Sequence, residues 1–406
     1  MAWNPKTAKA VPSISHGFQP FGGRQLLLAP PSTPTGISFV GLELFASIAR
    51  ANALVGATPS TIRALARSAS QLICAVVEDP PRLFCVTKDV EYFADAKRTS
   101  FSGDIGAGIA DLIMTRMGYL YRDNARTLLR TGKVGDFVYD GPPTGRTGVV
   151  LVEAKGRISA TTTLATLQTT VRNGYVNQVL PHVGKTLNQI KILHGYAVGL
   201  GSQPGAVSSD IHIEETSYLP AVPSNPSFPP DFSAADARPP SSSFSATQVA
   251  LGNYRALFGL LGADEVTTAI DAIRERQVST FIDRRERIER YLRALTSPPT
   301  VDLVTLEPRS LLTEAPLLIR VGIVLQIAEA FLNQLLEILT NTREYLDLPT
   351  VQPAFSENGV VFPDGFFVNA VPVMPVGNPF SPLSQFGGGG VVSATPAALA
   401  LRATAR

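Results

Sequence analysis

The sequence predicts an α/β protein built around a mixed β-sheet with helices on its faces. In residues 100–220, apolar residues repeat first at helical and then at strand intervals, and the pattern changes several times. Helices that alternate with strands are typical of a sheet that is covered on both sides. The segments are helical patterns starting near 104 and at 161–180, a β-branched strand at 149–152, and strand-like runs at 192–200 and 211–219.

The composition is that of a globular protein with a sizeable core. The chain has 406 residues, of which 45% are hydrophobic and 17% are charged. Gly and Pro are abundant, at 33 and 32 residues, so part of the chain is expected to form loops. The net charge of +2 favours no class of partner, but residues 82–200 hold 15 Lys and Arg against nine Asp and Glu. This local excess suits a polyanionic partner.

Shifts in composition divide the chain into six predicted segments. Pro, Gly and Ser are frequent near both ends and around residue 230, while apolar residues at helical spacing fill the regions between. The predicted segments are an extended or disordered arm (1–36), N-terminal helices (37–80), the sheet-containing core (81–220), a Pro/Ser-rich linker (221–245), a helical region (246–347) and a Pro/Gly-rich tail (348–406).

The most apolar stretch of the C-terminal half, residues 317–339, has apolar positions at a spacing near 3.5. This spacing predicts a helix with a packing seam, either internal or between subunits of a homo-oligomer. Charged residues such as Arg320 and Glu329 interrupt it, so no membrane span is expected. Pro5 and Pro12 break the N-terminal region where an export signal would be apolar, which favours a cytoplasmic location.

Cysteine and histidine suggest no metal or redox site. Cys74 and Cys85 occur without a Cys/His ligand pattern, so reduced thiols are expected. His182, His194 and His212 do not fall at metal-ligand spacing and are interpreted as structural.

Charge follows a fixed pattern at only one place, the end of the apolar strand at 149–152. Because strand side chains alternate, Glu153 and Lys155 share one face while Ala154 turns to the other. A carboxylate and an ammonium group are therefore expected side by side where a buried strand ends.

A hairpin brings a second carboxylate to the same place. Residues 141–148 are rich in turn formers, which predicts a tight connection between two antiparallel strands. If Asp140 pairs with Val149, Asp136 falls opposite Glu153, with Cβ atoms about 5 Å apart. Two carboxylates at that distance repel unless a cation lies between them or one is protonated. A divalent metal ion is the natural occupant.

The set of Asp136, Glu153 and Lys155 resembles the D…ExK site of the PD-(D/E)XK nuclease superfamily, whose fold is called restriction-endonuclease-like. The resemblance covers roughly residues 100–220 and includes the helices before and after the hairpin. It implies a restriction-endonuclease-like mixed sheet flanked by helices, with added N-terminal helices and a helical C-terminal region. It also implies a Mg²⁺-dependent nuclease that hydrolyses phosphodiester bonds in DNA. Mn²⁺ is expected to substitute for Mg²⁺, and RNA remains open as a substrate.

The resemblance also implies roles for single residues. Asp136 and Glu153 correspond to the metal-binding carboxylates, and the backbone carbonyl of Ala154 to the ligand between them. Lys155 corresponds to the residue that orients the attacking water or stabilises negative charge.

Two further positions are weaker candidates. Many family members add an acid from the first helix, for which Asp104 and Asp111 are available, although Asp104 is interpreted first as a helix-capping or first-turn acid. Gln178 corresponds in position to a glutamine that related nucleases place near the site, although a solvated helix glutamine is the preferred interpretation. Asp140 borders the turn and is interpreted as structural.

Two other interpretations remain open. The charged residues could form an incidental salt bridge on a surface hairpin. Alternatively, the chain could be a non-catalytic nuclease-like module that binds nucleic acid or protein. The sequence does not distinguish DNA from RNA, or endonuclease from exonuclease.

Overall fold

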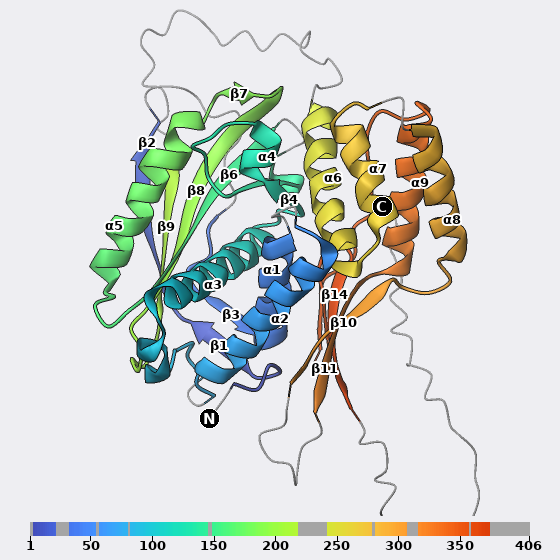
Figure 1. The fold of residues 1–406 in the computed structure, drawn as a ribbon. Helices are drawn as coiled ribbons and strands as arrows, with labels where there is room; N and C mark the ends of the chain where they lie inside the picture. Colours follow the sequence, from blue (N-terminus) through green and yellow to red (C-terminus); the bar gives the residue numbers. More distant parts are fainter. Residues whose placement is uncertain are drawn as a thin grey trace, which may run out of the picture.

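The structure is a computed structural model in which two layered units lie side by side (Figure 1). The first contains a seven-stranded mixed sheet, and the second contains a five-stranded sheet with the C-terminal helices. The structure describes residues 3–21, 32–53, 57–79, 82–144, 148–217, 242–277, 281–306, 316–356 and 359–373.

The seven-stranded sheet has the order β2-β9-β8-β6-β5-β4, with β7 paired to β8. Strands β4, β5 and β6 form an antiparallel meander, β6 and β8 are parallel, and β8 and β9 are antiparallel. The α/β class and the mixed sheet expected from the sequence are therefore confirmed. The strands are β2 (Ile14–Pro20), β4 (Tyr121–Asn124), β5 (Phe137–Asp140), β6 (Val149–Ile158), β7 (Thr186–Leu187), β8 (Ile190–Ser202) and β9 (Asp210–Ser217).

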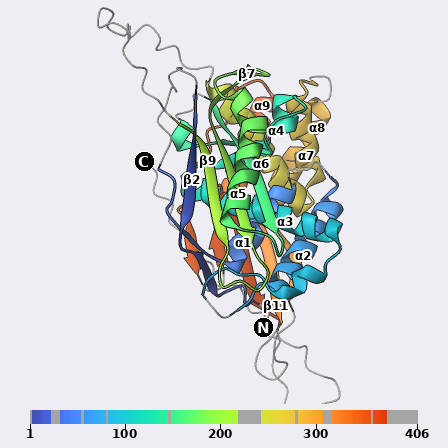
Figure 2. The same cartoon turned by 90° about the vertical axis from the view of Figure 1, so that its left-hand side faces the viewer.

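Two helices cover the two faces of this sheet. α3 (Asp95–Arg116) packs on the face that carries Val150 and Val152, and α5 (Leu164–Gly174) packs on the face of Leu151. Figure 2 shows α5 beside the long strands β2 and β9. After α5 the chain continues through a π-helical turn, Tyr175–Val179, before β7 begins. The helical pattern of residues 161–180 does not continue beyond this turn, because β7 and the start of β8 pair as a hairpin.

The N-terminal segment is extended, but it is not a free arm. β1 (Ala8–Val11) pairs with β3 (Ile37–Val40), and β2 adds to the main sheet in parallel with β9. The predicted N-terminal helices are present as α1 (Gly41–Ala53) and α2 (Pro59–Val76). The Thr58 side chain accepts a hydrogen bond from the N–H of Thr61 and so caps the start of α2.

The C-terminal unit combines helices with a sheet. The sequence predicted one helix over residues 317–339, but the first part is β11, which pairs with β14. No regular structure was predicted after residue 348, yet β12 to β14 form there within an antiparallel sheet of order β10-β11-β14-β13-β12. The elements are α6 (Ser242–Leu261), α7 (Asp264–Arg274), α8 (Phe281–Ala294), β10 (Thr300–Leu306), β11 (Leu317–Ile323), α9 (Leu325–Leu339), β12 (Ala354–Ser356), β13 (Gly359–Val361) and β14 (Phe366–Pro372). Most of the predicted linker, residues 218–241, lies outside the described residues.

A buried charge cluster joins the two units. Arg50 of α1 lies between Asp111 of α3 (Nε to Oδ2, 3.8 Å) and Asp364, just before β14 (Nη2 to Oδ2, 3.3 Å). Its guanidinium also stacks over the ring of Phe362, 4.3 Å from the centroid. Arg122 supplies a second positive charge to Asp111 at 3.1 Å. Buried charges are tolerated only when they are paired in this way, so the cluster fixes how the units meet.

No helix among the described residues is long and apolar enough to cross a membrane. Cys74 is half-buried, Cys85 is buried, and both are free thiols.

Candidate functional site

The hairpin has the register that the sequence predicted. Phe137 pairs with Val152, Val138 with Leu151 and Tyr139 with Val150. Continuing this ladder by one step sets Asp136 opposite Glu153.

Asp136 is anchored by backbone contacts on both sides. Its Oδ2 atom accepts a 2.9 Å hydrogen bond from the N–H of Ala154, and its carbonyl accepts a 3.0 Å bond from the N–H of Ala125. The preceding residue must be small, because a Cβ on Gly135 would lie 2.8 Å from the Val152 carbonyl oxygen. Asp136 itself is exposed, so its carboxylate stands at the rim of the site.

Glu153 is the buried member of the pair, with 1% of its surface exposed. Its Oε1 atom accepts a 2.7 Å hydrogen bond from Nε2 of Gln178 and contacts Nζ of Lys155. Its Oε2 atom is buried and has no hydrogen-bond partner within the described part of the chain. Burial, and then the nearby charge of Asp136, raise the pKa of Glu153 to about 7, while Lys155 acts in the opposite direction.

Helix α5 covers the side chains of Glu153 and Lys155. A Cβ on Gly174 of α5 would lie 2.9 Å from Cε of Lys155 and 3.2 Å from Cγ of Glu153. Gln178 follows in the π-helical turn that extends α5. Gln178 is half-buried, and its amide donates to Glu153 while it also borders the hollows beside the site.

Helix α3 approaches the same strand from the other face. A Cβ on Gly106 would lie 2.6 Å from the carbonyl carbon of Lys155, and one on Gly156 would lie 1.6 Å from the carbonyl oxygen of Ser102. The small residues that the sequence shows on this helix thus allow direct backbone contact. Together α3 and α5 hold the end of β6 from both sides.

Neither acid of α3 completes the site. Asp104 is half-buried and lies in the middle of α3, which begins at Asp95, so its interpretation as a helix-capping or first-turn acid is wrong. Its side chain hydrogen-bonds Asn52, at the end of α1. Burial raises the pKa of Asp104, and Lys97 opposes this shift. Asp111 is fully buried and belongs to the charge cluster of Arg50 and Arg122.

Three other residues singled out in the sequence make local hydrogen bonds away from the carboxylate pair. Asp140 accepts a 2.5 Å hydrogen bond from the Thr144 hydroxyl inside the turn, as expected. His182 bonds the carbonyl of Lys133, and His212 bonds Glu214.

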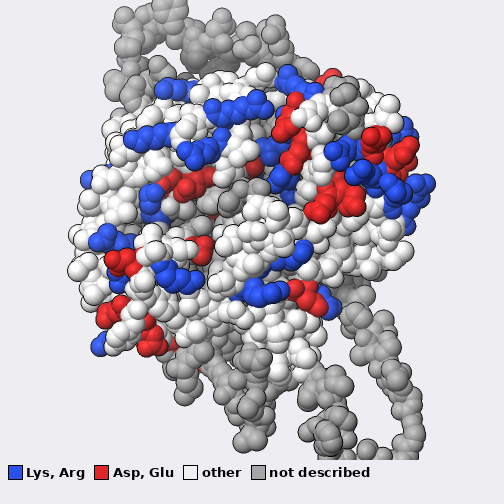
Figure 3. All heavy atoms as spheres, viewed as in Figure 1, with Lys and Arg blue, Asp and Glu red and all other residues white. Residues whose placement is uncertain are grey.

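Two hollows that include polar side chains flank the carboxylate pair. One, of about 420 Å³, is lined by Asp136, Gln178, Asn52 and Arg126, and a second, of about 440 Å³, is lined by residues including Lys155 and Lys133. Figure 3 shows Lys and Arg side chains gathered around α5, β7 and α4 (Ala125–Leu129). The surroundings therefore suit an anionic ligand.

Sequence reasoning missed the contributions of α1 and α4. Asn52, Asn124 and Arg126 line the first hollow, yet none belongs to a recognisable motif. The one local signal is at Asn124, which caps α4 by accepting a 3.0 Å bond from the N–H of Thr127.

The donor set suits a hard divalent cation at two carboxylates. The Asp136 and Glu153 carboxylates adjoin one another, and the buried Oε2 of Glu153 lacks a partner among the described residues. Mg²⁺ is commonly held by one or two carboxylates together with water and substrate oxygens. Within the described ranges no group of three or more His, Cys, Asp or Glu side chains is arranged to hold a metal ion, so a third carboxylate ligand is not found there.

Comparisons with known proteins return no match, whether the chain is compared with protein-family models, with curated proteins or with solved structures.

Proposed function

We propose that this chain is a metal-dependent nuclease that hydrolyses phosphodiester bonds. DNA is the proposed substrate, and RNA is the alternative. The observation that carries the proposal is the convergence of Asp136 and buried Glu153 at the end of one hairpin, beside Lys155 on the same strand. The hollows on either side, which include Arg126, Lys133 and Lys155, supply a surface for the phosphate backbone.

The order of elements supports a restriction-endonuclease-like core. Helix α3 precedes the meander of β4, β5 and β6, and helix α5 leads to β8, which runs parallel to β6. The carboxylates lie at the β5–β6 hairpin, with one helix before it and one after it, as the resemblance requires.

Asp136 and Glu153 would hold Mg²⁺ or Mn²⁺, with the Ala154 carbonyl as a third protein ligand. A bound ion of this kind makes water more acidic and neutralises charge on the phosphodiester. Glu153 is suited to this role because its burial and the charge of Asp136 make its negative charge costly without a cation.

Lys155 and Gln178 act around that pair. Both donate to the same Glu153 oxygen, Oε1, which leaves Oε2 directed elsewhere. Lys155 is 28% exposed, so its ammonium group can also reach a phosphate oxygen and stabilise charge as the bond breaks.

A cleavage assay on duplex DNA, single-stranded DNA and RNA tests the proposal. The wild-type protein is expected to cut in Mg²⁺ or Mn²⁺ and to be inactive in EDTA. The Glu153→Gln and Lys155→Ala variants, purified in parallel, are expected to be folded and inactive. Cleavage by the Glu153→Gln variant at the wild-type rate rules out this assignment of the site.

A second candidate is a non-catalytic nuclease-like module that binds nucleic acid or protein. The observation that favours it is the contact between Lys155 and Glu153, in which the protein itself partly neutralises the carboxylate. Calorimetry separates the two candidates, because this module would bind nucleic acid without binding a divalent ion.

A further inference from the structure

Two more hollows lie between α4 and the C-terminal helices, and both are separate from the hollow beside Asp136. The hollow beside Asp136 includes Arg126 of α4, and on the other side of α4 a hollow of about 310 Å³ is lined by Arg130 and by Gln248 of α6. The next hollow, of about 350 Å³, shares both of these residues and extends to Arg276 at the end of α7. We call these two hollows the α4–α6–α7 groove.

Unusual backbone conformations gather in this groove. Within the described residues, five non-glycine residues have positive φ, and four of them line it. Arg130 ends α4 in the left-handed conformation, and Asn188 and Gln189 form the two-residue turn between β7 and β8, so local structure requires these conformations. Glycine would relieve the strain at these positions but would supply no polar side chain. The four residues are Arg130 (φ 52°), Asn188 (φ 47°), Gln189 (φ 66°) and Arg276 (φ 56°).

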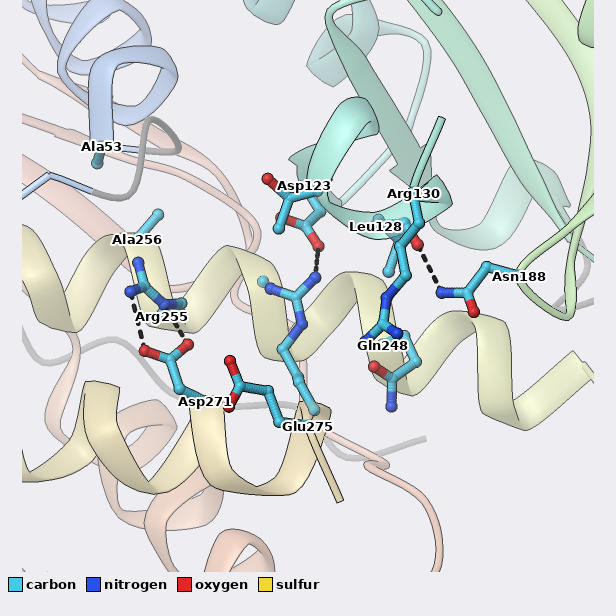
Figure 4. A pocket seen from close by; sticks show the side chains of 13 residues that line it. Ala53, Asp123, Leu128, Arg130, Asn188, Gln248, Arg255, Ala256, Asp271 and Glu275 are labelled. Atoms are coloured by element: carbon cyan, nitrogen blue, oxygen red, sulfur yellow. Dashed lines mark hydrogen bonds and ion pairs between the residues drawn. The ribbon is translucent and has the colours of Figure 1, made fainter. Parts of the chain in front are cut away.

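Two ion pairs form part of the walls of the groove, while other arginines of the groove have no ion-pair partner within the described ranges. Arg255 bonds Asp271 through two contacts of 2.5 and 2.9 Å, and Arg274 pairs with the buried carboxylate of Asp123. Figure 4 shows the Arg255–Asp271 pair at one side of the pocket, while Arg130 extends toward Gln248. Arg130 is exposed and makes no ion pair within the described part of the chain.

Arg276 is exposed, like Arg130, and has no ion-pair partner among the described residues. Amide side chains, including Gln189 and Gln248, line the same hollow as the two arginines. Two further acids, Glu275 and Glu344, border the groove, so the two arginines face some negative charge as well. Arginines interleaved with amides are typical of surfaces that contact phosphate and sugar groups.

We infer that a single nucleic-acid strand, held at the Asp136–Glu153 pair, crosses α4 and continues along the α4–α6–α7 groove. Arg126, Arg130 and Arg276 contact its phosphates in that order. A helix is about 10 Å across, which corresponds to about three stacked nucleotides. Oligonucleotides of about four nucleotides would therefore bind only beside the Asp136–Glu153 pair, and those of about twelve would also fill the α4–α6–α7 groove. The inference rests on the proposed nuclease function.

The test compares binding of a labelled single-stranded 12-mer and 4-mer by fluorescence anisotropy in EDTA. All proteins carry Glu153→Gln, which prevents cleavage. The test variant adds Arg130→Gly and Arg276→Gly, which relieve backbone strain and so guard against misfolding. The control adds Arg287→Ala, an exposed arginine of α8 outside the groove.

The double glycine variant is expected to bind the 12-mer about tenfold more weakly, with a salt slope reduced by about two. Its affinity for the 4-mer and its melting temperature should not fall. Equal 12-mer affinity in the double glycine and control variants overturns the inference. If the wild-type enzyme still cleaves DNA in that case, only the groove assignment fails. If no oligonucleotide binds and none is cleaved, the proposed function fails with it.

Discussion

The Oδ2 atom of Asp136 accepts a 2.9 Å hydrogen bond from the backbone N–H of Ala154. This contact spans the two strands of the hairpin and sets an exposed carboxylate beside the buried carboxylate of Glu153. The pair is therefore positioned by backbone register, and both acids keep oxygen atoms for a cation.

Replacing Glu153 with glutamine should separate activity from stability. Glutamine keeps the shape and the hydrogen bond with Gln178 but removes a buried negative charge. Cleavage is expected to fall by about 10²–10³-fold or more, because one metal-binding charge is lost. At pH 8 without metal, the melting temperature should stay the same or rise. A variant that melts well below wild type indicates instead that Glu153 holds the fold together.

The pKa of about 7 at Glu153 makes stability depend on pH. Because the folded-state pKa lies above the ordinary value of 4.5, the folded protein binds the proton more tightly than the unfolded chain. In EDTA, the contribution of the Glu153 carboxyl to the free energy of unfolding is complete below pH 4.5. It is lost as the pH rises through 7, and the loss is as much as about 3 kcal/mol.

Denaturant titrations between pH 5 and 8 measure this loss, with the Glu153→Gln variant as the control. Mg²⁺ should restore stability at pH 8 in the wild-type protein only. Parallel pH profiles for the two proteins would count against the raised pKa.

Two glycines of α3 form a matched pair for testing the contact with β6. Gly106→Ala places a Cβ 2.6 Å from the backbone of Lys155 and Gly156, and is expected to destabilise the fold by about 1–3 kcal/mol. Gly103 has open space around its Cβ position, so Gly103→Ala should be neutral or stabilising by about 0.5–1 kcal/mol. Chemical denaturation of both variants checks the difference. Equal effects would mean that α3 does not touch the strand at Gly106.

The Asp123–Arg274 pair should respond to pH in a predictable direction. Burial raises the pKa of Asp123 to about 6, while Arg274 opposes the shift. Arg274→Met leaves the carboxylate buried and unpaired, which is expected to cost about 3–5 kcal/mol at pH 8. The loss should be smaller at pH 5, where Asp123 takes up a proton. Adding Asp123→Asn should recover most of the stability at pH 8, and failure to do so would argue against a charge effect.

The site was predictable where local rules determine structure. Loop length and strand alternation were enough to set Asp136 opposite Glu153. Asn52 and Arg126 could not be predicted, because they reach the site through the packing of α1 and α4 and belong to no local motif.

The fold was mispredicted where pairing is between distant segments. Residues 317–323 are apolar at positions that suit either a helix or a strand, and their partner β14 lies in a Pro- and Gly-rich tail. In the same way, β2 joins the sheet through β9, about 200 residues later. A single sequence gives no signal for such pairings, because each strand is stabilised by a neighbour far along the chain.

Calorimetric titration of Mn²⁺ into the metal-free protein at pH 8 tests the central claim most directly. The wild type is expected to bind the ion, the Asp136→Asn and Glu153→Gln variants to lose that binding by at least about tenfold, and Lys155→Ala to retain it. Binding that is unchanged in both carboxylate variants would contradict the claim that Asp136 and Glu153 form a metal site.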